Sequence, residues 1–153
     1  MTTQLRNIGA LIAVMRASAN AAATAGGTGD ATAVTGTIID LMESGHPLSG
    51  VLAIPYTATL AAGATLSIGY TVQSGNTDDL GDATTLKTGP SAVVATGPAG
   101  GGTVSGTLEV DLPLAGAGRY VRANFTPNLS APGTDTAALS SVMVLGGFDR
   151  LPQ

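Results

Sequence analysis

The chain has 153 residues, which is enough to bury one hydrophobic core as a single domain. Only 10% of its residues are charged, against about 25% in an average soluble protein. The formal net charge is -4 without any basic cluster, which argues against direct nucleic-acid binding. The absence of cysteine excludes disulfides and thiolate metal sites.

The scarcity of charge also predicts how the protein is used. With a positive mean hydropathy, an isolated monomer would expose much neutral or apolar surface. Large apolar patches on soluble proteins usually mark contacts, so we expect an oligomer or a subunit of a larger assembly. Intrinsic disorder is not expected, because disordered chains combine low hydrophobicity with high net charge.

Residues 1–33 differ from the rest and are expected to form an N-terminal arm and tether. Asn7 could cap a short helix over residues 8–15, whose apolar positions fit a helical face, but the same residues could equally form a two-sided strand. A signal peptide beginning near Arg6 is disfavoured, because its apolar core is short and is closed by Arg16. A transmembrane span is not expected, because the run is far shorter than about 18 residues.

The Ala/Gly/Thr stretch that follows, residues 17–30, has little reason to fold alone. It is either a tether that carries an apolar anchor to another chain, or an edge strand folded back on its own sheet. The tether hypothesis assigns residues 4–16 to a contact with a different chain. The candidate interface residues of the arm and the tail are Arg6, Ile8, Leu11, Ile12, Met15, Arg16 and Arg150.

From residue 34 the pattern is that of strands divided by turns. A first strand is expected over residues 34–42, before a turn that contains Gly45 and Pro47. A second covers residues 52–60, where Pro55 has no N–H and indicates an edge strand or a bulge. Alternating Leu66, Ile68, Tyr70 and Val72 then predict a half-buried strand.

The second half continues in the same way. Loops are expected over residues 74–88, 97–102 and 126–136, with a short apolar piece at 92–95 and a strand at 104–112 between them. In residues 119–125 the side chains of Val121, Ala123 and Phe125 share one side. Residues 139–145 are apolar at both parities, which predicts a strand covered on both faces. These two strands are expected to form the centre of a β-sandwich.

Seven or eight strands at roughly ten-residue spacing predict an all-β fold, an antiparallel, jelly-roll-like β-sandwich. The sandwich is expected over residues 34–147, with a C-terminal tail at 148–153.

Few residues suggest chemistry. His46 is the only histidine and stands in an expected turn, with no second histidine or cysteine to complete a metal site. Asp78, Asp79 and Asp82 are the best cation candidates, but they lack the regular ligand spacing of an EF-hand, so a solvated turn is favoured. The glycines of residues 97–102 precede no Lys-Ser/Thr pair and no helix, which favours a flexible linker over a phosphate loop. We expect no catalytic, metal or cofactor site.

Arg119 and Arg122 are two of only six basic residues. They could form ion pairs across a subunit contact, because the guanidinium fork suits carboxylates. An intrachain partner on the preceding strand, Glu109 or Asp111, is favoured, because adjacent strands bring such pairs close.

Several short motifs are spread over most of the chain: Asn7-Ile8, Ile39-Asp40-Leu41, Tyr70-Thr71-Val72-Gln73-Ser74, Arg119-Tyr120-Val121-Arg122 and Val144-Leu145-Gly146-Gly147-Phe148-Asp149-Arg150. Together they resemble small phage head proteins that decorate or cement icosahedral capsids. The resemblance implies a jelly-roll subunit without catalytic residues, commonly a homotrimer, on the outer surface of the virion. Its partner there would be the major capsid protein, whose neighbouring subunits it bridges. The chain departs from the pattern in residues 17–29 and 97–102.

The alternative from another class is a surface-exposed binding module for carbohydrate or a host surface. Sugar rings are usually met by exposed aromatic side chains, and this chain has no tryptophan, three tyrosines and two phenylalanines. A secreted hydrolase is the least favoured class, because the sequence offers no paired nucleophile and base.

Overall fold

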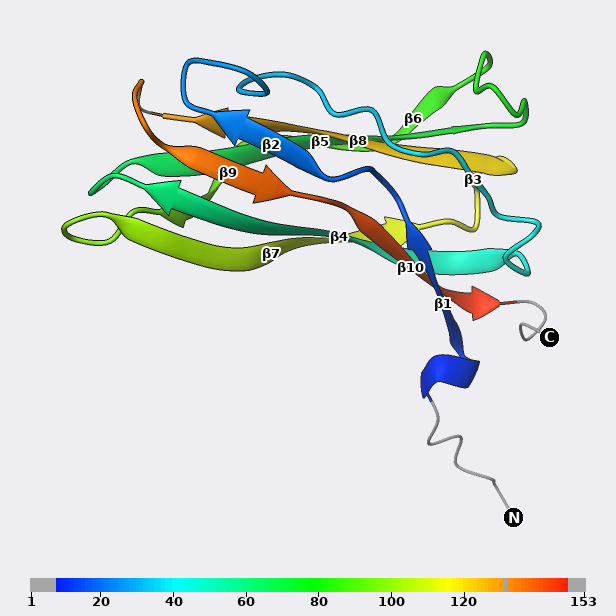
Figure 1. Ribbon diagram of the computed structural model, residues 1–153. Helices are drawn as coiled ribbons and strands as arrows, with labels where there is room; N and C mark the ends of the chain where they lie inside the picture. Colours follow the sequence, from blue (N-terminus) through cyan, green and yellow to red (C-terminus); the bar gives the residue numbers. More distant parts are fainter. Residues whose placement is uncertain (1–7, 131, 149–153) are drawn as a thin grey trace.

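The computed structural model describes residues 8–130 and 132–148, and the strands form two antiparallel sheets packed face to face (Figure 1). A short 3-10 turn, η1 (Ile8–Ala10), precedes the first strand. The first sheet contains β1 (Ile12–Arg16), β2 (Ala21–Thr24), β4 (Pro47–Leu60), β7 (Gly102–Pro113), β9 (Thr136–Leu139) and β10 (Val142–Phe148). The second contains β3 (Ile39–Asp40), β5 (Thr65–Gly75), β6 (Thr84–Thr96) and β8 (Tyr120–Leu129). The predicted all-β sandwich is confirmed.

The strand order is that of a jelly roll. β4 pairs with β7 on one side and with both β10 and β9 on the other, while β1 pairs with β10 and β2 with β9. β1 and β2 lie end to end in one row, and so do β10 and β9. Counted in this way, each sheet has four rows of strands. Along the chain, β1/β2 pairs with β9/β10, β3 with β8, β4 with β7, and β5 with β6. Such a wrapped double Greek key is the jelly-roll arrangement.

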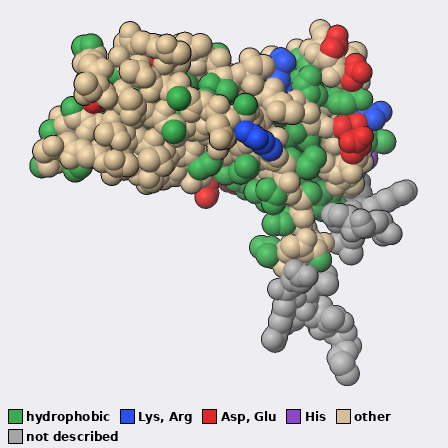
Figure 2. Space-filling view, viewed as in Figure 1, with side chains coloured by type: hydrophobic (Ala, Val, Ile, Leu, Met, Phe, Trp, Pro, Cys, Tyr) green, Lys and Arg blue, Asp and Glu red, His purple; other side chains and the backbone are tan. Residues whose placement is uncertain are grey.

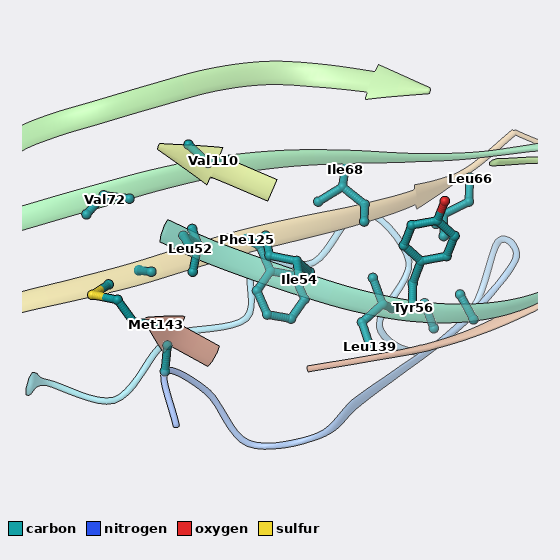
Figure 3. Close-up of a cluster of buried hydrophobic side chains, with 14 of the residues drawn as sticks. Leu52, Ile54, Tyr56, Leu66, Ile68, Val72, Val110, Phe125, Leu139 and Met143 are labelled. Atoms are coloured by element: carbon teal, nitrogen blue, oxygen red, sulfur yellow. The ribbon is translucent and has the colours of Figure 1, made fainter. Parts of the chain in front are cut away.

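The core lies between the sheets and follows the period-two alternation of the strands. On β4 the side chains of Leu52, Ile54, Tyr56, Ala58 and Leu60 all point inward and are buried. They meet side chains of the opposite sheet, among them Ile68 and Phe125, as Figure 3 shows. Burying one such aliphatic or aromatic side chain contributes about 1.5–3 kcal/mol, so this interface is the main source of stability.

Tyr56 also ties the two sheets together through a hydrogen bond. Its hydroxyl donates to the carbonyl oxygen of Val94 on β6, with an oxygen–oxygen distance of 2.6 Å. The ring reaches β6 by lying over Gly106, the cross-strand partner of Tyr56 on β7, where a Cβ atom would overlap the phenol. Gly106 is therefore required by close approach.

The structure corrects the expected centre of the sandwich. Val121, Ala123 and Phe125 are buried on β8 as predicted, but the run 139–145 is not one strand covered on both faces. It is interrupted at Ser140 and Ser141, which separate β9 from β10. β8 and β10 lie in opposite sheets, so the two strands expected at the centre contribute to different layers of the sandwich.

Pro55 lies at this interruption. The prediction of an edge strand or bulge is wrong, because β4 is central and its register with β7 runs without a shift through the pair Pro55 and Thr107. The Ser140 N–H donates to the Pro55 carbonyl oxygen, at 3.2 Å, so this edge of Pro55 faces the gap between β9 and β10. The absent N–H of the proline falls where the neighbouring strand is broken, and no ladder bond is lost.

Several predicted boundaries also move. The strand expected over residues 34–42 is reduced to an isolated bridge, Val34 to Phe125, and the two residues of β3. The loop expected over residues 74–88 ends earlier, because β6 begins at Thr84. The loop expected from residue 126 begins later, because β8 continues to Leu129.

The N-terminal stretch belongs to the sheet. Of the two conformations left open, residues 12–16 adopt the strand, and the segment after them folds back on its own sheet as β2. Ala13 and Met15 pack against the core, whereas Val14 faces outward. The expected division at residues 33 and 34 therefore does not coincide with an edge of the sandwich. The tail begins at Phe148, the last residue of β10, and its other residues lie outside those described.

Candidate interaction surfaces

The acidic turn between β5 and β6 is held by its own carboxylates. Asp82 accepts hydrogen bonds from the Asn76 N–H at 2.8 Å, the Thr77 N–H at 3.1 Å and the Thr77 hydroxyl at 2.7 Å. The Asn76 N–H, followed by the Thr77 hydroxyl, lowers the pKa of Asp82 to about 2. Asp79 accepts from the Gly81 N–H at 2.8 Å, which lowers its pKa too. These oxygens are engaged in closing a turn.

Metal ligation finds no further support here. Within residues 8–130 and 132–148, no three or more histidine, aspartate or glutamate side chains gather in a group that could hold an ion. His46 is exposed in the turn before β4, with Nε2 at 2.8 Å from the sulfur of Met42. The 97–102 segment connects β6 to β7, and Gly100, Gly101 and Gly102 all have positive φ.

Arg119 has an intrachain partner, but not a predicted one. Its guanidinium forms an ion pair with Asp40 at 2.6 Å and stacks over the Tyr120 ring, whose centroid is 5.0 Å away. Hydrogen bonding from Arg119 lowers the pKa of Asp40. Glu109 and Asp111 were the expected partners; that prediction is wrong, because β7 lies in the other sheet.

Arg122 belongs to a hydrogen-bond network with uncharged partners on the outer face of the same sheet. Arg122 Nη2 and Asn124 Nδ2 both donate to Gln73 Oε1, at 2.8 Å and 3.0 Å. Asn124 Oδ1 in turn accepts from the Gly36 N–H at 3.0 Å. Because β3 pairs with β8 and β8 with β5, the motifs around residues 40, 73 and 120 meet in one sheet. Their polar residues stabilise the strand order.

The first sheet carries an apolar surface on the side away from the core. The cross-strand registers place Val14, Val144 and Val51 in one row, and Val142 and Ala53 in the next. Val14 is 60% exposed, and the other side chains are half-buried. Figure 2 shows hydrophobic side chains gathered over β1 and β10. We call this surface the outer apolar face; its members are Ile12, Val14, Val51, Ala53, Val142 and Val144.

The remaining outer face of this sheet is polar. Thr57 pairs with Ser105 and Thr59 with Thr103 through hydroxyl contacts of 3.1 Å. The outer apolar face is therefore bounded along the strands by a surface of small hydroxyl side chains. An open hollow of about 510 Å³ lies partly on the outer apolar face, where Ile12, Val51 and Val144 line it together with Ser49, Asp111 and Gly146.

The residues predicted as an interface separate into groups. Ile8 is 71% exposed on η1, Leu11 is half-buried, and Ile12 belongs to the outer apolar face. Met15 is partly buried and packs against the core of its own chain. Arg16 is exposed at the sheet edge, and its Nε donates to the Ser18 carbonyl oxygen at 2.8 Å. Arg6 and Arg150 lie outside the described residues.

Sequence analysis missed the most exposed member of this surface, Val14. The signal was present, because a strand over residues 12–16 must place Ile12, Val14 and Arg16 on one side and Ala13 and Met15 on the other. The helical alternative hid this division. The structure also holds no described helix that is long and apolar enough to cross a bilayer.

Comparisons with known proteins give structural neighbours only. No family model matches the chain, and no curated protein sequence matches it. A chain in the structure of infectious bursal disease virus Gx strain is similar over 92% of this chain, with 11% identity and a TM-score of 0.46. A chain of the VP2 subviral particle of infectious bursal disease virus shows 12% identity and a TM-score of 0.43. This chain spans about one third of those chains, 34% of each.

A bacterial protein is among the neighbours as well. The K3 cleaved adhesin domain of Lys-gingipain from Porphyromonas gingivalis w83 is 18% identical, with a TM-score of 0.39 over 74% of this chain and 63% of the domain.

Proposed function

We propose that this chain is a structural protein of a virion, lying on the outer surface of an icosahedral phage capsid and cementing it by bridging neighbouring subunits of the major capsid protein. The observation that carries the proposal is the exposure of aliphatic side chains at one end of the jelly roll. Ile8 on η1 is 71% exposed, and it stands before the outer apolar face, whose Val14 is 60% exposed. Apolar surface of this kind marks a contact with another macromolecule.

The resemblance to capsid decoration proteins supports the choice of partner. Three of its motifs meet in the sheet β3–β8–β5, where Asp40 pairs with Arg119, and Gln73 accepts from Arg122. Motif residues that are distant in the sequence thus interact within one sheet. A cement protein gains from modest contacts repeated over a lattice, since multivalency raises the effective affinity.

The segment before β1 is assigned to the capsid contact. η1 projects from the sheet in Figure 1, and the contact would include Ile8 and the residues before it. The association of three copies, which the resemblance implies, is part of the proposal. No reaction, cofactor or nucleic-acid partner is proposed.

A sugar-binding module gains no specific support. Tyr56 and Phe125 are buried in the core, and Tyr70, Tyr120 and Phe148 are half-buried. Among the described residues, no aromatic ring lies open as a platform for a pyranose.

Electron cryomicroscopy of particles from the organism that encodes the chain tests the proposal. We expect density for this jelly roll at icosahedrally repeated positions on the outer surface, absent from particles assembled without the gene. Particles without such density, or with the chain on the inner surface, would contradict the proposal.

A binding assay tests the role of η1. Ile8→Asp introduces a charge at an exposed site, so we expect unchanged thermal stability and at least about tenfold weaker binding to particles that lack the protein. Val93→Asp is the matched control, because Val93 is 58% exposed on β6. Equal binding by both variants and the unmodified chain would contradict the assignment.

A further inference from the structure

We propose that the outer apolar face is where two copies of this chain associate, sheet against sheet, about a two-fold axis parallel to the strands. One row of cross-strand neighbours crosses the first sheet from edge to edge. The registers place Arg16 beside Val142, Val142 beside Ala53, and Ala53 beside Glu109. The row therefore runs from a base on the edge strand β1, across two apolar positions, to an acid on the edge strand β7.

Such a row is complementary to its own rotated copy. A two-fold axis along the strands, between β10 and β4, exchanges the two edges of the sheet. Arg16 of one copy then faces Glu109 of the second copy, and the reverse pair forms at the opposite edge. Val142 faces Ala53 of the second copy. The positive charge at one edge of the sheet and the negative charge at the other edge thus favour a second copy in the rotated orientation.

The neighbouring row fits the same operation. It consists of Val14, Val144, Val51 and Asp111. After rotation, Val144 faces Val51 of the second copy, so the centre of the contact is aliphatic. Val14 comes to the rim beside Asp111 of the second copy. Stacked sheets lie about 10 Å apart, and these side chains would occupy the space between the two copies.

The charged groups at the rim are free for this pairing. Neither Arg16 nor Glu109 has an ion-pair partner among residues 8–130 and 132–148, where the single ion pair joins Arg119 and Asp40. Arg16 does donate to Ser18 and Asn20, at 2.8 Å and 3.3 Å, which orients its guanidinium along the edge. Lys87 donates to the backbone carbonyl of Asp111 at 2.6 Å and leaves Glu109 unpaired.

The size of the face sets the strength of the contact. Three residue rows across four strands cover about 20 Å by 20 Å, so two copies bury about 800 Å² in total. Stable interfaces usually bury more than about 1,200 Å², so this one is expected to be weak and concentration-dependent. It uses a different surface from η1, and on a lattice it would join copies held on neighbouring subunits.

The test is sedimentation velocity of the full chain over a range of concentrations, without any capsid. We expect reversible self-association. Arg16→Glu and Glu109→Arg should each weaken it at least about tenfold, because like charges then face each other. The double variant carrying both changes should recover most of the affinity.

Val14 gives a directional control. Val14→Asp adds a second acid beside Asp111 and should weaken association more than Val14→Lys, which places a base there. Val93→Asp, equally exposed on the other sheet, should have no effect. A chain that stays monomeric at every concentration, or an association that none of the Arg16, Glu109 and Val14 variants alters, overturns the proposal. Because no capsid is present, this result is independent of the proposed function.

Discussion

At the scale of single residues, the acidic turn shows how charged side chains are used in this protein. Asp82 takes hydrogen bonds from one hydroxyl and two backbone N–H groups, so its ionised form is part of the folded turn. The sequence reveals the cluster of acids and the glycines beside them. It does not reveal whether the oxygens point outward to an ion or inward to the turn, because that depends on the backbone path.

Replacing Asp82 with asparagine should make stability less dependent on pH. The folded pKa of about 2 lies below the unfolded value of 3.8, so the ionised group stabilises the fold fully above pH 3.8. That stabilisation is lost as the pH falls through about 2. We expect Asp82→Asn to lower the free energy of unfolding at pH 7, with the deficit shrinking towards pH 2, in urea titrations.

Asp78→Asn is the control for this prediction. Asp78 stands in the same turn, is exposed and makes no side-chain hydrogen bond among the described residues. Its replacement should change stability little at either pH. An Asp82→Asn deficit that stays constant from pH 7 to pH 2 would show that the carboxylate charge is not the cause.

Arg119 shows why an ion-pair partner cannot be predicted from proximity in the sequence. An intrachain acid was predicted correctly as the kind of partner, but Asp40 is separated from it by 79 positions. In a jelly roll, strands that follow each other in sequence often lie in opposite sheets. The nearest acid in the sequence is therefore not the nearest acid in space.

At the scale of secondary-structure elements, the run 139–145 shows why an apolar pattern can mislead. Leu139, Met143 and Leu145 are buried on the inner side, but Val142 and Val144 are only half-buried on the outer side. The pattern indicated a strand with a layer on both faces. Within the described residues of one copy, no second layer covers the outer side of β10. The outer apolar face therefore suggests that another copy supplies this layer.

The interruption between β9 and β10 is bridged by two buried serines. Ser18 Oγ accepts from the Ser141 N–H at 2.9 Å and donates to the Ala19 carbonyl oxygen, while the Ser141 carbonyl oxygen accepts from the Ala17 N–H. Both serines are fully buried. These hydrogen bonds connect the segment between β1 and β2 to the segment between β9 and β10, where neither the β1–β10 nor the β2–β9 pairing continues.

These two serines predict opposite responses to alanine. Ser18→Ala removes the acceptor of a buried N–H and should destabilise the fold by about 1–3 kcal/mol. Ser141→Ala removes a buried hydroxyl that has no partner among the described residues, so it should be neutral or stabilising. Chemical denaturation of the two variants measures the difference, and equal losses would show that cavity formation, not hydrogen bonding, dominates.

At the scale of the whole molecule, the sequence predicts the sandwich but not its wrapping. Alternation in residues 52–60, 66–72 and 104–112 identifies inner faces correctly, because it is a local property of a strand. The pairing of β1/β2 with β9/β10 joins residues more than a hundred positions apart. Nothing local marks that pairing, so residues 12–24 were assigned to an arm when they form the edge row of the sheet.

This edge row leads to a prediction about truncation. Deleting residues 4–16, which the tether hypothesis assigns to another chain, would remove β1, whose Met15 packs against the core beside Met143. We expect that deletion to lower the free energy of unfolding by at least about 2 kcal/mol, the value of burying one such side chain. Deleting residues 4–10 leaves β1 in place and should leave the urea midpoint nearly unchanged. Equal midpoints for both deletions would contradict the role of β1 in the fold.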